Sequence, residues 1–280
     1  MEHILIVDGS NLLFQMFYGM PARIIGLHGQ PIQGTVGFVG ALLKIINHLQ
    51  PTHVAVVFDG QCQNDRCLLD ENYKANREDY SLLPEEETPF CQLPEIFSAL
   101  DYLGICHRET TDCEADDWIA GYAKQYADRY FVTVVSQDSD FFQLIRENVR
   151  VLRYRGDNSV LCDRRYIKEK LGIEPEQYAD FKSMTGDTAD NIKGAYKIGP
   201  KTAAALLQQF GTLEDILQHT QQVAKPSVRA SLECSTERLR INQLLIRLRG
   251  AEKLPFSLEE MAYHHKGQTS TQVLRAIGVK

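Results

Sequence analysis

Long apolar runs are missing from this sequence of 280 residues. No window holds the ~18 uninterrupted apolar residues that a membrane-spanning helix needs. The first eleven residues, MEHILIVDGSN, also lack the basic-then-apolar layout of a signal peptide, because an acid stands at position 2 and a predicted strand follows. These absences argue against a membrane partner and predict a cytoplasmic protein.

Closely spaced cysteine pairs are absent as well. The seven cysteines stand at positions 62, 67, 91, 106, 113, 162 and 234, an odd number without a CxxC pair. This pattern argues against a disulfide framework and against a zinc site. It favours free thiols in a reducing compartment.

The chain has no excess of basic residues. Its formal net charge is −7, which taken alone argues against a nucleic-acid partner. Nine carboxylates, introduced below, are expected to lie near metal ions, and setting these nine negative charges aside changes the balance from −7 to +2. A local acidic site within a mildly basic surface is what a metal-dependent nuclease requires.

Short apolar runs alternate with helical patterns in the first part of the chain. Strands are predicted at Ile4–Val7, His53–Phe58, Phe131–Val135 and Val149–Tyr154, with helical patterns around 37–49, 93–103, 115–126 and 141–145. This alternation predicts an α/β fold with a mostly parallel sheet. Three of the strands end just before an aspartate, at the sheet edge where open α/β folds bind ligands.

Two further regions differ from this pattern. Gln61–Thr88 is polar and charged, has no strand pattern, and is longer than an ordinary loop, which predicts a functional or disordered insertion. From about Tyr166 onward the sequence is helical, with glycine and proline as punctuation. We place a boundary near residues 165–180, between an α/β domain and a smaller helical one. Residues after about Pro255 are not assigned.

Nine carboxylates fall into five groups along the chain: Asp8; Asp59; Glu114, Asp116 and Asp117; Asp138 and Asp140; and Asp187 and Asp190. Thr111-x-x-Glu114 fits a capping box, so the third group is predicted to open a helix. Each group alone is an ordinary turn or cap sequence. Five groups in order, three of them at strand ends, favour a common site instead.

So many carboxylates cannot stay ionised close together without cations, because like charges raise one another's pKa. Magnesium or manganese, two or more ions with oxygen ligands, would resolve the repulsion. Two such ions roughly 4 Å apart would activate a water and stabilise the leaving oxygen of a phosphodiester. The pattern therefore favours metal-dependent phosphoryl chemistry.

Seven motifs then carry a resemblance to a known family: LIVDGSN, VVFDG, YKANR, EADD, SQDSDF, GDTADNI and GAYKIGPKTAAALLQQFG. In order and spacing the chain resembles the 5′ nuclease superfamily, from Ile4 to about Leu248. That superfamily includes the 5′–3′ exonuclease domain of DNA polymerase I, the phage 5′ nucleases and the flap endonucleases. The resemblance implies a PIN-like sheet flanked by helices, a helical arch, and a C-terminal helix–three-turn–helix domain.

The resemblance also implies roles for the carboxylates. One metal site would be built by Asp8, Asp59, Asp116 and Asp117, with contributions from Glu114 and Asp138. A second would use Asp138, Asp140, Asp187 and Asp190. All of these residues are present here.

The insertion resembles the arch of the family, at about residues 61–90. Lys74 matches the arch lysine that neutralises the scissile phosphate, and Arg77 a backbone contact. Arg66 and Tyr73 match DNA-binding positions. A lysine and an arginine on a polar helix are otherwise most often only solvated.

Residues 191–210 resemble the helix–three-turn–helix. Gly194, Lys197, Gly199 and Lys201 would bind DNA backbone there, and the family holds a potassium ion in this loop. A generic helical hairpin is the alternative. Two departures stand out: many relatives carry arginine at the position of Gln15, for which Arg23 is a candidate replacement, and phenylalanine at the position of Asp65.

The organisation expected is a catalytic domain at 1–170, a DNA-binding domain at 171–255 and a tail at 256–280. The expected function is a structure-selective 5′ nuclease that acts as a monomer on DNA with a 5′ flap, a nick or a free 5′ end. A weakly active DNA-binding paralogue and a PIN-type ribonuclease are the alternatives. The insertion and the hairpin argue against the ribonuclease, and the intact Asp187/Asp190 pair argues against the paralogue.

Overall fold

A six-stranded sheet forms the centre of the larger lobe in the computed structural model, which describes residues 2–27, 29–60, 65–77, 80–84 and 87–279. Its strands, in order across the sheet, are β3 (Cys106–Glu109), β2 (His53–Phe58), β1 (His3–Asp8), β4 (Phe131–Val135), β5 (Val149–Arg153) and β6 (Val160–Cys162). The first five are parallel and β6 is antiparallel. The predicted mostly parallel α/β fold is confirmed.

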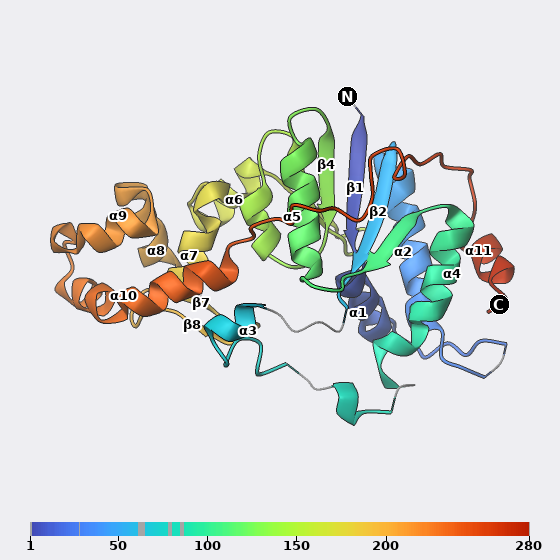
Figure 1. Cartoon of the computed structure of the whole chain (residues 1–280), viewed down its shortest axis with the longest axis horizontal. Helices are drawn as coiled ribbons and strands as arrows, with labels where there is room; N and C mark the ends of the chain where they lie inside the picture. Colours follow the sequence, from blue (N-terminus) through green and yellow to red (C-terminus); the bar gives the residue numbers. More distant parts are fainter. Residues whose placement is uncertain (1, 28, 61–64, 78–79, 85–86, 280) are drawn as a thin grey trace.

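Helices cover both faces of the sheet, which explains the unbroken apolar strands. On one face lie α1 (Gly9–Gly19), α2 (Gln33–Leu49) and α4 (Leu93–Leu103), and on the other lies α5 (Ala115–Tyr126) (Figure 1). Every residue of β2 is buried. By contrast β3 and β6 are short and partly exposed, and their sequences carried no strand signal.

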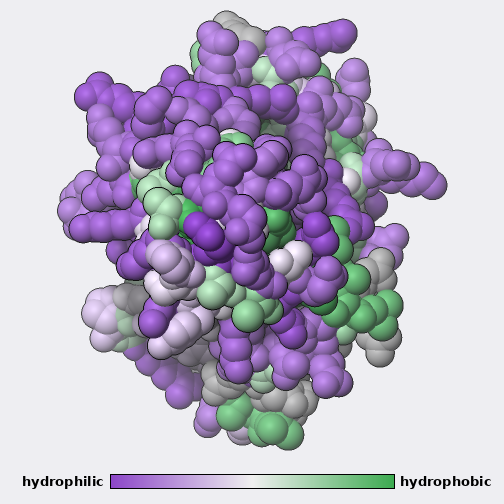
Figure 2. Space-filling model, turned by 90° about the vertical axis from the view of Figure 1, so that its left-hand side faces the viewer, coloured by the Kyte–Doolittle hydropathy of each residue, from purple (hydrophilic) through white to green (hydrophobic). Residues whose placement is uncertain are grey.

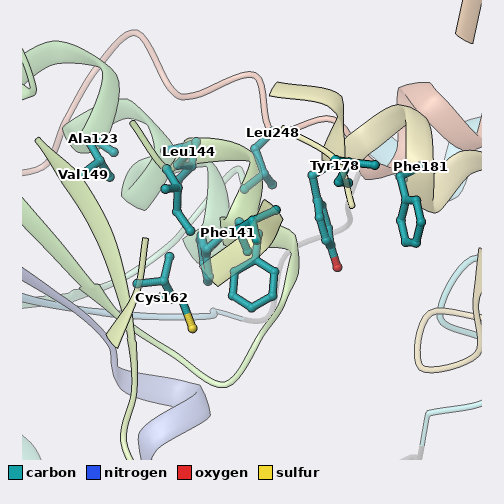
Figure 3. Close-up of a cluster of buried hydrophobic side chains, with 14 of the residues drawn as sticks. Ala123, Phe141, Leu144, Val149, Cys162, Tyr178, Phe181 and Leu248 are labelled. Carbon is teal, nitrogen blue, oxygen red and sulfur yellow. The ribbon is translucent and has the colours of Figure 1, made fainter. Parts of the chain in front are cut away.

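The second lobe is helical and lies at the left of Figure 1. It contains α6 (Arg164–Leu171), α7 (Tyr178–Thr185), α8 (Pro200–Phe210), α9 (Leu213–Gln218) and α10 (Pro226–Ile246), with a small hairpin of β7 (Gly186–Asp187) and β8 (Ile192–Lys193). One hydrophobic cluster runs through both lobes. In it Tyr178 and Phe181 of the helical lobe continue the layer of Phe141 and Leu144 (Figure 3).

The chain after α10 returns across the α/β lobe, and is red in Figure 1. The backbone N–H of Ala251 donates to the carbonyl of Asp117, and that of Val54 donates to the carbonyl of Met261. Helix α11 (Ser270–Ala276) then packs against α2 and α4. The residues that the sequence left unassigned therefore pack on the α/β lobe.

The arch segment, residues 61–90, is less helical than expected. Its described parts contain α3 (Asp65–Leu69), the 3₁₀ helix η1 (Tyr80–Leu82), and the start of η3 (Pro89–Gln92). Residues 61–64, 78–79 and 85–86 lie outside the described residues. Between them, 70–77 is a run of turns, because Asp70 accepts hydrogen bonds from the backbone and side chain of Asn72 and so competes with helix formation.

Two other expectations concern helices and thiols. Within the ranges that the structure describes, no helix is long and apolar enough to cross a membrane. Among the described residues, Cys67, Cys106, Cys162 and Cys234 carry free thiols.

The return of the chain over α5 generates a stability prediction. A Cβ at Gly121 would lie 2.7 Å from Leu254 Cδ2 and 2.8 Å from the Ala251 carbonyl oxygen. Gly121→Ala should therefore lower the free energy of unfolding by about 1–3 kcal/mol, measured by urea denaturation. Gly40→Ala is the control, because the nearest atom to its Cβ is 3.9 Å away. It should stabilise α2 by roughly 0.5–1 kcal/mol. Equal effects of the two changes would contradict the tight packing of the return segment.

Candidate metal centre and nucleic-acid interface

Aspartates from neighbouring strands meet at the carboxyl edge of the sheet. Asp8 is the last residue of β1, Asp59 follows β2 directly, and Asp138 follows β4 after two residues. Strand β1 pairs with both β2 and β4, in a register that sets Asp8 opposite Val57. The topology therefore brings three carboxylates, far apart in sequence, to one edge.

Local hydrogen bonds fix the first two of these side chains. Asp8 accepts from the Asn11 backbone N–H at 3.0 Å, which caps α1, and from the Ser136 hydroxyl at 2.8 Å. Asp59 accepts from the Ala115 backbone N–H at 2.9 Å. Both carboxylates thus stabilise the start of a helix and also lie at the carboxyl edge of the sheet.

The bond from Ala115 to Asp59 corrects the predicted capping box. Helix α5 does begin after Glu114, but Glu114 makes no capping hydrogen bond, and the Thr111 hydroxyl donates to Asp112 instead. The cap comes from Asp59, across the sheet edge. A tertiary partner has replaced the local one, which the spacing of residues could not reveal.

Burial and mutual repulsion raise the pKa of four aspartates. For Asp8 burial raises the pKa to about 7, with further contributions from Asp59 and Asp138. Burial also raises the pKa of Asp116 well above its usual value, assisted by Asp138 and Asp59. The site therefore holds a strong excess of buried negative charge.

The second part of the site lies toward the helical lobe. Burial raises the pKa of Asp138 and of Asp140, and the charges of Asp187 and Asp190 add to both effects. Asp138 interacts with the first group and with the second. It is the carboxylate that the two groups share.

Basic side chains interleave with these acids. Arg66 forms ion pairs with Glu114 and Asp117, and Lys74 forms one with Glu114. The charge of Lys74 also lowers the pKa of Asp116 and Asp138. Glu114 and Asp117 therefore pair with basic side chains of the arch and lie at the margin of the group of buried aspartates.

Two further cations serve the second group. Arg77 donates to Asp190 at 2.7 Å, and Lys182 on α7 pairs with Asp187. No motif in the sequence indicated Lys182, whose charge lowers the pKa of Asp140. Its only signal was a basic residue five positions before Asp187, on the helix that leads into that motif.

The donor atoms fit an oxygen-preferring divalent cation. Asp140 Oδ1 is buried and has no hydrogen-bond partner, which is costly for a carboxylate unless a cation lies nearby. The surrounding candidate ligands are also carboxylates, the donors that magnesium and manganese prefer. Among the described residues, however, no three acidic, histidine or cysteine groups form a ready-made metal site.

Two predicted DNA contacts of the arch are buried. Tyr73 is 7% exposed and packs with Ala179, Ile192, Leu245 and Ile246. Arg66 is 8% exposed, among the acids that it pairs with. In this structure both residues join the arch base to the body of the protein and neither presents a surface to DNA.

The remaining predicted DNA contacts lie on the hairpin of residues 194–201, which follows β8 and runs into α8. Ala195 and Ile198 are buried and anchor it, whereas Lys197 and Lys201 are exposed. The face of the molecule over the helical lobe is largely hydrophilic (Figure 2).

The two glycines of this hairpin differ. A Cβ at Gly194 would lie 2.4 Å from the Met184 carbonyl oxygen, so this glycine is needed for packing within the protein. A Cβ at Gly199 would meet nothing within 4 Å. Of the two, only Gly194 is required by packing within the protein, and the DNA contact predicted for both stays a prediction.

Gln15 and Asp65 are the two positions at which this sequence departs from the pattern of the family that it resembles. Gln15 donates to the Tyr154 carbonyl at 2.6 Å. Arg23 lines a separate hollow of about 330 Å³ with Phe17 and Met20. Its role as a replacement for a cation at position 15 stays a prediction. The side chain of Asp65 lies outside the described residues.

Comparisons with known proteins find similarity over residues 3–269 of this chain. Residues 3–172 match the family model of the 5′-3′ exonuclease N-terminal resolvase-like domain, and 173–269 match the 5′-3′ exonuclease C-terminal SAM fold. DNA polymerase I of Rhizobium leguminosarum is 35% identical over 93% of this chain, which spans only 26% of that protein. The 5′-3′ exonuclease of Aquifex aeolicus is 33% identical over 83% of this chain and 78% of its own length.

Solved structures agree on the fold. The T5 D15 protein, co-crystallised with metal ions, superposes with a TM-score of 0.70 at 25% identity, over 88% of this chain and 90% of the other. The catalytic core of Rad2, in complex with a DNA substrate, superposes with a TM-score of 0.62 at 15% identity, over 99% and 93%. The helical second lobe is thus part of a fold found in other proteins.

The raised pKa of Asp8 generates a prediction for metal-free protein. Folded Asp8 binds a proton up to about pH 7, whereas its ordinary pKa is 3.8. The unfolding free energy should therefore fall as pH rises from 4 to 7. Asp8→Asn keeps a good helix cap and removes this loss, so with chelator at pH 8 it should be more stable than the parent by up to about 4 kcal/mol.

Urea denaturation at pH 4 and pH 8 measures this difference. At pH 4 the two proteins should be nearly equal in stability, because Asp8 is neutral in the parent. The same pH dependence in both proteins would contradict the buried, repelled state of Asp8.

Proposed function

The chain belongs to the 5′-3′ exonuclease family, and from that premise we propose that it is a structure-selective 5′ nuclease that hydrolyses phosphodiester bonds at 5′ flaps or 5′ ends of DNA. One observation carries the proposal. Buried aspartates with raised pKa values meet at the sheet edge, and the arch delivers Lys74 and Arg77 to the same place. Acids for metal ions and cations for phosphate are both present there.

Relatives support this activity. The relative from Aquifex aeolicus, most of whose length the chain spans, is named a 5′-3′ exonuclease. The chain spans about a quarter of the matched DNA polymerase I proteins, so their polymerase activity is not transferred. DNA with a 5′ flap, a nick or a free 5′ end is the proposed substrate. The cytoplasmic location and the monomeric state stay predictions.

Two or more magnesium or manganese ions are the proposed cofactors. Asp8, Asp59, Asp116 and Asp117 would hold one, with contributions from Glu114 and Asp138, and Asp138, Asp140, Asp187 and Asp190 would hold another. Bound there, the ions would supply Lewis acidity toward the phosphodiester and lower the pKa of an attacking water. Potassium at the hairpin of residues 194–199 stays a prediction.

The residues of the arch would act on the phosphate itself. Lys74 lies close enough to Asp116 and Asp138 to lower their pKa, so its ammonium group can also reach a phosphate beside them. Arg77 is about half-exposed and pairs with Asp190. We assign to both the stabilisation of negative charge that develops on the phosphate.

The hairpin would hold the duplex away from the cut. Lys197 and Lys201 are exposed, and the open backbone at Gly199 lies at the start of α8, where N–H groups favour phosphate. These contacts neutralise phosphates and release counterions, and so contribute affinity and salt dependence. They do not contribute directly to bond cleavage.

Cleavage assays test the activity. End-labelled 5′-flap, nicked and single-stranded DNA, with a single-stranded RNA, should be compared with magnesium and with excess chelator. We expect cleavage of DNA substrates only with the metal. Asp116→Asn should stop cleavage and leave DNA binding intact, because the side chain binds metal and not DNA.

Three outcomes would overturn the proposal. Full activity in chelator would exclude metal catalysis, and preferential cleavage of RNA would indicate the PIN-type ribonuclease. DNA binding without cleavage at any metal concentration would indicate the weakly active paralogue. Gly40→Ala, which lies away from the site, serves as the folded control.

The position of Lys74 generates a second prediction. If its charge acts as the bond breaks, Lys74→Ala should lower the single-turnover rate by about 10²–10³-fold, with little loss of affinity. Lys197→Ala is the matched control and should show the reverse, weaker binding that low salt restores and a normal rate. A rate within about threefold of the parent would exclude a chemical role for Lys74.

A further inference from the structure

Two non-glycine residues with left-handed backbone lie on turns that face each other. Lys74, in the arch-base turn (residues 70–77), has φ 59°, and Asn191, in the carboxylate turn (residues 187–192), has φ 57°. Asparagine tolerates this conformation, but lysine rarely adopts it. Such a backbone persists where surrounding contacts hold it.

Four hydrogen bonds join the two turns, and one of them is the bond from Arg77 to Asp190 described above. The Lys74 backbone N–H donates to the Asp190 carbonyl at 3.0 Å. The Asn191 side chain donates to the Asn72 carbonyl at 2.8 Å, and the Asn76 side chain donates to the Thr188 carbonyl at 2.9 Å. The bonds run in both directions between the turns and flank Lys74 on both sides in sequence.

Apolar packing supports the same junction. Tyr73 is buried against Ile192, two residues after Asp190, and against Leu245 of α10. The ammonium group of Lys74 lies 4.9 Å from the centre of the Tyr73 ring. The backbone of Lys74 is thus held relative to Asp190 by its neighbours on each side.

A lysine side chain is flexible, so the place of its charge depends on where its backbone is anchored. We propose that Asn191 and Asn76 are positioning residues that hold the arch-base turn against the carboxylate turn, and so place Lys74 for the reaction. This inference rests on the proposed nuclease function. Neither asparagine touches the reacting atoms; each acts through Lys74.

Asn191→Gly tests the tie between the two turns, the hydrogen bond from the Asn191 side chain to the Asn72 carbonyl, by itself. Glycine adopts the left-handed backbone without cost, so only the side-chain hydrogen bond is lost. Asn76→Ala breaks the tie from the other turn, at a residue that is not next to a carboxylate of the site. Each change should slow single-turnover cleavage by about 3–10-fold, the range for one lost hydrogen bond. Affinity for DNA should be unchanged.

A double-mutant cycle shows whether the effect passes through Lys74. In a Lys74→Ala background, Asn191→Gly and Asn76→Ala should each change the rate by less than about twofold. The magnesium concentration for half-maximal rate should stay at the parent value. An undiminished loss in that background, or a shift in the magnesium dependence, would mean that Asn191 acts through Asp190 and would overturn the proposal.

Amide hydrogen exchange tests the tie without any activity. In the DNA-free protein, the segment 70–77 should exchange faster in both variants than in the parent, because the Lys74 amide loses its protection. Gln50→Gly is the matched control, at a residue that lies between α2 and β2. Gln50 also has left-handed backbone (φ 47°), and its side chain donates to the Asn47 carbonyl at 2.8 Å.

Gln50→Gly should leave both the rate and the exchange of 70–77 unchanged. Unchanged exchange in Asn191→Gly and Asn76→Ala would overturn the tie. A parent that cleaves none of the substrates would overturn the proposed function instead, and the exchange measurement would still decide whether the two turns are joined.

Discussion

Repulsion among buried aspartates at the carboxyl edge of the sheet is the constraint on which the rest of this structure depends. Burial raises the pKa of these groups and neighbouring carboxylates raise it further, so that of Asp8 reaches about 7 although hydrogen bonds from Asn11 and Ser136 lower it. The molecule offsets the cost with cations from two segments: Arg66, Lys74 and Arg77 from the arch, and Lys182 from α7. The arch and the helical lobe are therefore electrostatic parts of the site.

The same constraint explains why the two lobes share one core. Asp187 and Asp190 can complete the acidic site only if the helical lobe is held against the sheet. The apolar layer around Phe141 and Tyr178 and the arch base around Tyr73 both hold it there. A site divided between lobes needs this rigidity, because small displacements of catalytic groups cost much of the rate.

Much of this was predictable from the sequence because it depends on local patterns. Unbroken apolar runs predict buried parallel strands, and motif order predicts the family. Contacts between distant segments were not predictable. The capping box at Thr111 was wrong because Asp59 caps α5 from another strand. The assignment of each aspartate to a metal stays a prediction.

The sequence by itself determined the buried strands β1, β2, β4 and β5, the order of acidic motifs and the family to which the chain belongs, since these follow from residue type and spacing. Only the tertiary structure decided which acids are neutralised by cations, that Tyr73 is buried, and that packing requires Gly194 but not Gly199. The physical reason is that burial and electrostatic partnership are set by neighbours in space. Several of those neighbours here come from distant segments, as Lys74 and Glu114 do, which are 40 residues apart.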